Sequence, residues 1–198
     1  IQAQIIQIGG APTYENTLLL QPDFFSTGGF TEFTLVGIGA DLAQPGDLTE
    51  TYAPAVTIAP GTVIEPVAES LLAIPHVRGS NTFGLTRLLK PVGNRKPVSL
   101  NFETVEGGIN SVVDGLLKVR GDIVMGEGSR ILTDPLGHVS FHGQTVAILG
   151  SVTAPGGSIR VIGSDSFPSR EDAIEALPTV YLGPTSRLST KGTAIYLA

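Results

Sequence analysis

Two histidines stand four residues apart in the stretch HVSFH, at positions 138 and 142. Imidazole is the commonest protein ligand of transition metals, so a close pair of this kind suggests a metal site. On a strand, both side chains would lie on one face, with Val139 and Phe141 on the other. Residues four apart on a strand are roughly 13 Å apart, which is too far for both imidazoles to bind one ion. We therefore interpret His138 and His142 as outward-facing polar residues and predict no metal site.

Four acidic residues are candidates for the carboxylate chemistry of polysaccharide lyases and hydrolases. They are Asp114, Asp122, Glu127 and Asp134. Glycoside hydrolysis needs two carboxyl groups that flank one bond, and a calcium site needs several oxygen ligands close together. These four residues are spread over separate segments, and none belongs to a close pair of aspartates or an Asp-x-Asp phrase. We interpret them as solvated carboxylates of turns and predict no catalytic residue.

Two short stretches place serine beside glycine, as nucleophile turns and phosphate-binding loops do. They are GGS at 156–158 and GSDS at 163–166. Neither matches G-x-S-x-G or G-x-x-x-x-G-K-[ST], and no helix of proper length is expected after them. The chain has no Cys, which excludes a cysteine nucleophile, a thiolate metal site and disulfides. We interpret both stretches as turns and predict no cofactor.

The elements that would position these residues are written as repeats. ILTDPLGHVSFHG (131–143) aligns without a gap with SVTAPGGSIRVIG (151–163), twenty positions later. What the copies share is Thr, Pro, Gly and alternating apolar residues. The aligned pairs are Thr133 with Thr153, Pro135 with Pro155, Gly137 with Gly157, Val139 with Ile159, Phe141 with Val161, and Gly143 with Gly163. The candidate residues Asp134, His138 and His142 are replaced by Ala154, Ser158 and Ile162. The positions that the two copies share are therefore those that form turns and strands.

Further copies are partial. IVMGEGSRILTD (123–134) aligns with VYLGPTSRLSTK (180–191), which places Ser129-Arg130 opposite Ser186-Arg187. VTIAPGTVIEP (56–66) has the same build of apolar triplet, small residue, turn and second apolar step. We predict a structural turn role or a stacked polar ladder for the repeated Ser-Arg pair.

Apolar residues alternate with polar ones over four to six residues between the turns, which indicates short half-buried strands. One repeat buries about five or six apolar side chains, worth about 10 kcal/mol, against roughly 20 to 40 kcal/mol of backbone entropy for twenty residues. A single repeat therefore cannot fold alone, whereas stacked repeats share one core. We predict an all-β fold, a right-handed parallel β-helix with about twenty residues per turn. A β-sandwich and a β-propeller are the alternatives, but the first does not explain the fixed register and the second repeats at about 40 residues or more.

Two segments interrupt the repeats. Residues 75–97 are rich in Gly, Pro, Asn and Arg, and we expect a protruding irregular loop there. In residues 164–178, a possible cap at Ser169, acidic residues after it and Pro178 predict one or two helical turns. We predict that residues 1–198 form one β-helix segment with these two inserts, and that it is a piece of a much longer chain.

Composition limits the partners. The formal net charge is −6, and the twelve Lys and Arg residues are scattered, so we predict no binding to nucleic acid. No apolar run approaches the roughly 18 residues of a membrane-spanning helix, so we predict no membrane insertion.

Nearly the whole chain resembles the repetitive shaft of filamentous haemagglutinin-like exoproteins of Gram-negative bacteria. The resemblance is carried by the ordered series FSTGGFTEFTLVG, VTIAPGTVIEPVAESLLAIP, GSNTFGLT, LLKVRGDIVMGEGSRILTDPLGHVSFHGQTVAILGSVTAPGGSIRVIG and LPTVYLGPTSRLSTKGTAIYL. It implies a segment of a long right-handed β-helix that is secreted and displayed at the cell surface, with a role in adhesion and biofilm contact. The N-terminal secretion domain of such proteins is not evident, so an outer-membrane partner in two-partner secretion is implied by the kinship alone.

This resemblance makes the chain a structural and adhesive scaffold, with no enzyme activity. Its expected partners are glycans or proteins on host or neighbouring cells, contacted by the flat faces and the inserts. A carbohydrate-active β-helix enzyme is the main alternative, and a trimeric phage tail-fibre β-helix is another.

Overall fold

Strands and turns make up nearly all of the computed structural model, which describes residues 1–42, 52–75, 83–105, 121–164 and 179–195. Only one short helix is present in these ranges, the 3-10 helix η1 at Pro22–Ser26. The strands form three large sheets, and every pair of neighbouring strands within them is parallel. The prediction of an all-β fold is confirmed.

We number the three sheets in the order in which the chain enters them. Sheet 1 consists of β1 (Gln2–Ala3), β4 (Glu32–Gly37), β11 (Ser99–Thr104), β14 (His138–Gly143) and β17 (Ser158–Gly163). Sheet 2 consists of β3 (Thr17–Leu20), β2 (Ile5–Ile8), β7 (Val56–Ile58), β12 (Asp122–Met125), β15 (Thr145–Ile148) and β18 (Thr179–Leu182). Sheet 3 consists of β8 (Val63–Ile64), β13 (Arg130–Leu132), β16 (Ser151–Thr153) and β19 (Arg187–Ser189).

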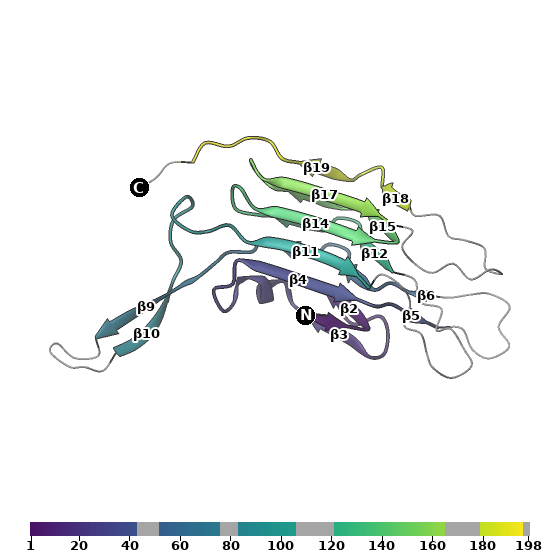
Figure 1. Cartoon of the computed structure of the whole chain (residues 1–198), viewed down its shortest axis with the longest axis horizontal. Coiled ribbons are helices and arrows are strands. Elements are labelled where there is room, and N and C mark those ends of the chain that lie inside the picture. The colour runs from purple at the N-terminus through teal and green to yellow at the C-terminus, as the bar shows by residue number, and fades with distance from the viewer. Residues whose placement is uncertain (43–51, 76–82, 106–120, 165–178, 196–198) are drawn as a thin grey trace.

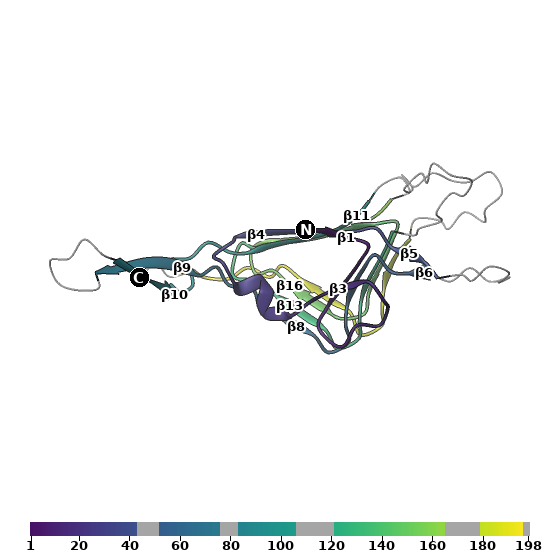
Figure 2. The same ribbon diagram turned by 90° about the horizontal axis from the view of Figure 1, so that it is seen from below.

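Consecutive strands pass through the sheets in a fixed order. Strands β11, β12 and β13 enter sheets 1, 2 and 3 in turn, and so do β14 to β16 and β17 to β19. We refer to each such set of three strands as a tier. Figure 1 shows the tiers one above another from the N-terminal to the C-terminal end, and Figure 2 shows the sheets enclosing a common interior.

The core is built from columns of apolar side chains, one residue from each tier. In sheet 2, Ile123 is aligned with Val56 below it and with Val146 above it, and all three side chains are buried. In sheet 1, Phe102 and Phe141 are aligned and fully buried, and their rings stack with centroids 5.0 Å apart. Residues between the inward ones point outward, as the burial alternation of β11, β12, β14 and β15 shows. The predicted period of two is therefore confirmed in these strands.

The N-terminal end of the core is covered differently. Helix η1 begins with Pro22, whose fixed φ suits a first helical position, and it packs beside β8. Phe25 of η1 is fully buried and makes edge-to-face contacts with Phe24 and Phe33. This helix is not predicted from the sequence.

The repeat of twenty residues is confirmed in sheet 1, where β14 pairs with β17 from His138 opposite Ser158 to Gly143 opposite Gly163. The alignment of Thr133 with Thr153 is wrong by one residue, because sheet 3 pairs Leu132 with Thr153. The turns that follow are again twenty residues apart, since Gly137 and Gly157 donate to the carbonyls of Asp134 and Ala154. Thr133 continues the ladder of sheet 3, since its amide donates to the carbonyl of Thr153 and its side chain is buried like that of Ala154. The earlier tier therefore has one additional residue between Thr133 and Gly137.

The repeated Ser-Arg pair has the predicted turn role. Ser129 and Ser186 are two tiers apart, and their hydroxyls donate to the carbonyls of Gly126 and Gly183 at 2.6 and 2.7 Å. Their backbone amides donate to the same carbonyls. The serines therefore close equivalent turns between sheets 2 and 3.

A hairpin leaves the stacked sheets between β8 and β11. Its strands are β9 (Ser70–Pro75) and β10 (Phe83–Leu88), which pair antiparallel. The sequence analysis expected an irregular loop over 75–97, but β10 is a regular strand, because its backbone groups find partners in β9. A second antiparallel pair joins β5 (Ala40–Asp41) to β6 (Tyr52–Ala53). The helical turns predicted within 164–178 lie outside the described residues, except for Ser164.

Candidate functional site

The two histidines lie on the outward face of β14, as the sequence predicted. His138 is exposed, and its Nδ1 is 2.8 Å from the Oγ of Ser158 on the neighbouring strand. His142 is half-buried and aligned with Glu103 of β11. The described residues contain no group of three His, Cys, Asp or Glu side chains that could hold a metal ion.

One of the four candidate acids is not a solvated turn carboxylate. Asp134 forms a two-pronged ion pair with Arg95, with Nε to Oδ2 and Nη2 to Oδ1 both at 2.6 Å, and both side chains are 11% exposed. The hydrogen bonds that Arg95 donates to Asp134, together with the negative charge of that carboxylate, raise the pKa of Arg95 above its ordinary value despite partial burial.

The other three acids do not join it. Asp122 is half-buried at the start of β12, Glu127 is exposed in a turn, and Asp114 lies outside the described residues. The structure therefore gives the described candidate acids no shared site. The ion pair of Asp134 instead holds the segment that follows the hairpin against the turn that precedes β14.

The outward side of sheet 1 carries polar side chains from four adjacent strands, and we refer to it as the polar face. The Asn101 amide on β11 donates to the carboxylate of Glu32 at 3.2 Å and to the hydroxyl of Thr34 at 3.4 Å, both on β4. The members of the polar face are Glu32, Thr34, Ser99, Asn101, Glu103, His138, Ser140, His142, Ser158 and Arg160.

The polar face arranges hydrogen-bonding groups in rows that repeat at the strand spacing of about 4.8 Å. Hydroxyl, amide, imidazole and carboxylate groups alternate along these rows, so an elongated ligand with many hydroxyl groups could make several contacts at once. The hydrogen bonds described for this face join side chains of adjacent strands. One of them is a serine–histidine pair, in which the hydroxyl of Ser158 and the Nδ1 of His138 meet at an exposed position of the sheet.

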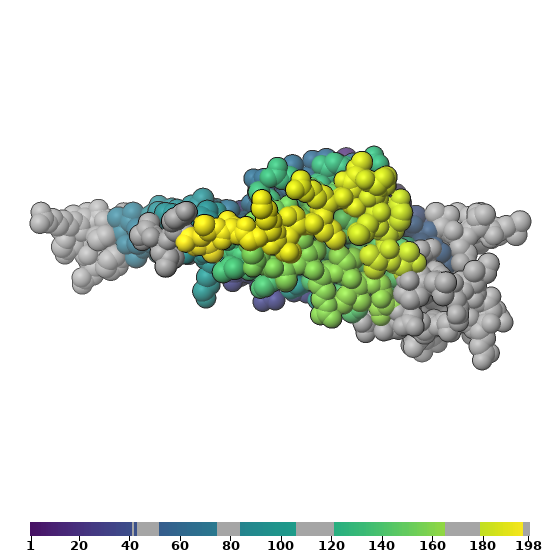
Figure 3. Space-filling model, turned by 90° about the horizontal axis from the view of Figure 1, so that it is seen from above, coloured from purple at the N-terminus to yellow at the C-terminus, as the bar shows by residue number. Residues whose placement is uncertain are grey.

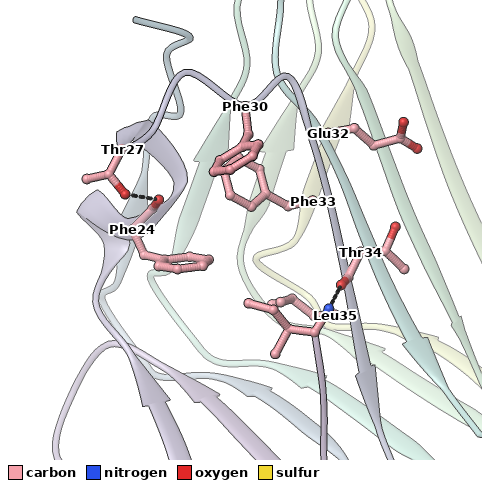
Figure 4. Close-up of a pocket in the computed structure, with 8 residues that line it drawn as sticks. Phe24, Thr27, Phe30, Glu32, Phe33, Thr34 and Leu35 are labelled. Atoms are coloured by element: carbon pink, nitrogen blue, oxygen red, sulfur yellow. Dashed lines mark hydrogen bonds between the residues drawn. The ribbon is translucent and has the colours of Figure 1, made fainter. Parts of the chain in front are cut away.

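A hollow of about 340 Å³ lies beside the N-terminal end of β4. Figure 4 shows Phe24, Phe30 and Phe33 around it, and Leu35 lies deeper along the strand. Ile1 closes one side, where its terminal amine donates to the carbonyl of Thr34 at 2.8 Å.

The hollow is apolar, and Glu32 is the one ionisable side chain among its lining residues. Thr27 lines it too, but its hydroxyl donates to the carbonyl of Phe24 at 2.9 Å. A lining with a single carboxylate lacks the two groups that carboxylate catalysis requires. The sequence signal for this hollow is the group of phenylalanines between 24 and 33, whose spacing matches neither a helical nor a strand period.

The hairpin is the second feature that sequence reasoning placed but did not describe. Most of the large apolar side chains of β9, β10 and the following residues are exposed. The segment also holds several basic residues, so the Lys and Arg residues are less scattered than the sequence analysis stated. The signal was present in the sequence, since SLLAIP and FGLTRLL carry apolar residues on both sides of a strand.

Comparison with known proteins gives no further guide, because no protein family, curated protein or solved structure matches this chain. Within the described residues, no helix has the length and apolar character to cross a bilayer.

Proposed function

We propose that the chain is a segment of a right-handed parallel β-helix that acts as a stiff, adhesive rod in a secreted or surface-displayed exoprotein of the filamentous haemagglutinin-like kind. The resemblance of its ordered motifs to such shafts supports this proposal.

The β-helix part rests on the order of the strands. Three consecutive tiers enter sheets 1, 2 and 3 in the same sequence, and their strands stay parallel to those of the tier before. A chain that repeats this path winds around one axis. Parallel crossovers are right-handed in nearly all proteins, which gives the hand of the proposed winding.

The adhesive part rests on one observation, the continuity of the polar face across β4, β11, β14 and β17. Parallel stacking keeps equivalent outward positions in line, so each further tier lengthens the rows of hydrogen-bonding groups. Many weak contacts to an extended surface glycan or protein would then add up through multivalency.

Attachment of coated beads to cells tests the proposal. Beads that carry the chain should bind a cell monolayer above the background of albumin-coated beads. The triple variant Asn101→Ala, Ser140→Ala, Arg160→Glu should reduce attachment at least fivefold, since it removes contacts in three adjacent strands.

The matched control is Thr57→Ala with Val124→Ala, on the outward side of sheet 2. This variant should bind like the unaltered chain. Equal attachment of the triple variant and the control would contradict a role for the polar face. Release of reducing sugar from pectin, alginate or hyaluronan would contradict the scaffold assignment in favour of an enzyme.

A further inference from the structure

The hairpin and the residues that follow it form an exposed, largely apolar surface, which we name the arm (residues 70–75 and 83–96). Figures 1 and 2 show the arm extending away from the stacked sheets, and the space-filling view of Figure 3 shows it as a projection from the body of the molecule. Leu71 and Leu85 are 66% and 72% exposed. The other exposed large apolar residues of the arm are Leu72, Ile74, Leu88, Leu89 and Val92.

Both faces of the arm are apolar. Ala73 is aligned with Leu85 on one face, and Leu72 is aligned with Thr86 on the other, beside Ile74. A hairpin of two strands is marginally stable in water by itself, so apolar residues on both faces do not serve its own folding. A contiguous apolar patch of this kind on a soluble protein marks an interaction surface.

The charge of this region is opposite to that of the rest of the chain. None of the eighteen Asp and Glu residues lies within 70–102, whereas five of the twelve Lys and Arg residues do, which leaves seven basic residues against all eighteen acids elsewhere. Two of these five pair with acids outside the segment, Arg87 with Glu69 and Arg95 with Asp134. Lys90 and Lys96 are exposed, and no ion pair involves either side chain among the described residues. The partner that fits is therefore both anionic and apolar.

Of the partners with this chemistry, an anionic lipid surface fits best. A second copy of the arm would bring like charges together, and a nucleic acid would leave the leucines in water. A bilayer of anionic phospholipid offers phosphate groups to the lysines and acyl chains to the leucines at adjacent depths.

We propose that the arm binds peripherally to anionic phospholipid membranes. Leu71, Leu72 and Leu85 lie at the boundary between headgroups and acyl chains, and Lys90 and Lys96 lie at the level of the phosphates. The arm stays in the interface, because the outer edges of its two strands carry backbone groups that need water. This inference does not depend on the proposed adhesive function, since the apolar and basic residues of the arm would contact lipid whatever the stacked sheets bind.

The chain contains no Trp, so a single introduced Trp reports on one place alone. Leu85→Trp should show a blue shift of its emission with phosphatidylcholine vesicles that contain a quarter phosphatidylglycerol, and no shift with phosphatidylcholine alone. The matched control is Val63→Trp on β8, another exposed apolar position, which should show no shift with either vesicle. Circular dichroism checks that both variants keep the fold.

Co-sedimentation with the same anionic vesicles separates the contribution of the leucines from that of the lysines. Leu71→Asp with Leu85→Asp, and separately Lys90→Glu with Lys96→Glu, should each weaken binding about tenfold or more. The charge control, Arg187→Glu with Lys191→Glu, lies on exposed residues near the C-terminal end and should bind within twofold of the unaltered chain. High salt should weaken binding, since exposed charges are screened.

Several results would overturn the proposal. Absence of binding to anionic vesicles would do so, and so would binding that the arm variants leave unchanged. A dimer in sedimentation velocity that both arm variants dissociate, without vesicle binding, would show that the arm is a protein interface instead.

Discussion

Asp134 illustrates how a turn residue that resembles a catalytic acid can serve structure instead. Its carboxylate receives two hydrogen bonds from Arg95, thirty-nine residues earlier in the chain, and the pair is largely withdrawn from water. Charge-assisted bonds of this geometry are among the stronger polar contacts in proteins. The pair holds the return segment of the arm against the stacked sheets.

We predict that Asp134→Ala lowers the free energy of unfolding by about 2 to 3 kcal/mol, because it leaves a partly buried guanidinium without its partner. The measurement is urea denaturation. Glu65→Ala serves as the control, since the Glu65 pair with Arg130 is long, at 3.6 Å, and half exposed. That variant should change stability by no more than about 1 kcal/mol. Equal effects of the two variants would contradict the account.

The pH dependence of this contribution follows from the sign of the shift. The pKa of Arg95 is raised in the folded state, so its stabilisation is complete below the ordinary pKa of arginine and is lost only in strongly alkaline solution. Arg95 itself should therefore add no pH dependence to unfolding between about pH 5 and 9.

Sequence reasoning could place Asp134 in a turn, but it could not find Arg95. Arg95 returns to the stacked sheets only after the hairpin. The spacing of residues in the sequence does not show where the chain lies after a hairpin of this kind, so the pairing of Arg95 with Asp134 could not be predicted. Thr133 was misaligned for a related reason, since a single extra residue in a turn leaves the flanking motifs recognisable.

At the scale of elements, the turns before β14 and β17 show what the repeat conserves. In both, Pro occupies the second position and the third has positive φ, which is +68° at Leu136 and +63° at Gly156. This is the pattern of a type II turn, which favours glycine at the third position. Leu136 pays a conformational penalty that Gly156 avoids.

Leu136→Gly should therefore raise the free energy of unfolding by about 0.5 to 1 kcal/mol, since relief of the left-handed conformation outweighs the added freedom of the unfolded chain. The side chain lost is 52% exposed, so little burial is sacrificed.

The reverse exchange in the next turn completes the test. Gly156→Ala should destabilise by about 1 to 2 kcal/mol. A Cβ there would meet only Leu136, at an ordinary 3.5 Å, so the effect is conformational. A destabilising Leu136→Gly or a neutral Gly156→Ala in thermal or urea unfolding would refute the equivalence of the turns.

The elements that belong to the repeat could be predicted from the sequence, whereas the elements outside the repeat could not. Alternation in HVSFHG predicted β14 with Val139 and Phe141 inward, and the structure agrees. Helix η1 could not be predicted, because its five residues are too few to show the periodic spacing of apolar residues that indicates a helix. The strand β10 was not predicted because the nearby glycines and prolines suggested a loop.

At the scale of the molecule, the spacing between tiers is nearly constant where no insert intervenes. Thr145 follows its partner Asp122 by 23 residues, Ser151 follows Arg130 by 21, and Ser158 follows His138 by 20. These values agree with the predicted repeat of about twenty residues. The constancy allows each apolar column to continue from tier to tier.

Additional residues enter at two of the three connections. The segments 43–51, 106–120 and 165–178 all fall between a strand of sheet 1 and the next strand of sheet 2, and the arm falls between sheets 3 and 1. The connections from sheet 2 to sheet 3 stay short, with Gly126 to Ser129 and Gly183 to Ser186 as equivalent turns. Length variation is thereby kept away from the columns that stabilise the stack.

The winding of the chain around one axis is the central claim, and its register can be trapped chemically. The protein has no Cys, so an introduced pair has no competitor. Aligned residues on neighbouring strands are about 4.8 Å apart, within the span of a disulfide. One outward pair per sheet is available: Ser140 with Arg160, Ala147 with Tyr181, and Arg130 with Ser151.

The decisive measurement is the extent of disulfide formation in these three double-cysteine variants under mild oxidation, read by gel mobility and mass spectrometry. Each aligned pair should close nearly completely in the monomer. A control shifted by two residues, Ser140→Cys with Ser158→Cys, should stay reduced, since its separation of about 8 Å exceeds the reach of a disulfide. Closure of the shifted pair, or failure of an aligned pair in any one sheet, would contradict the stacked winding.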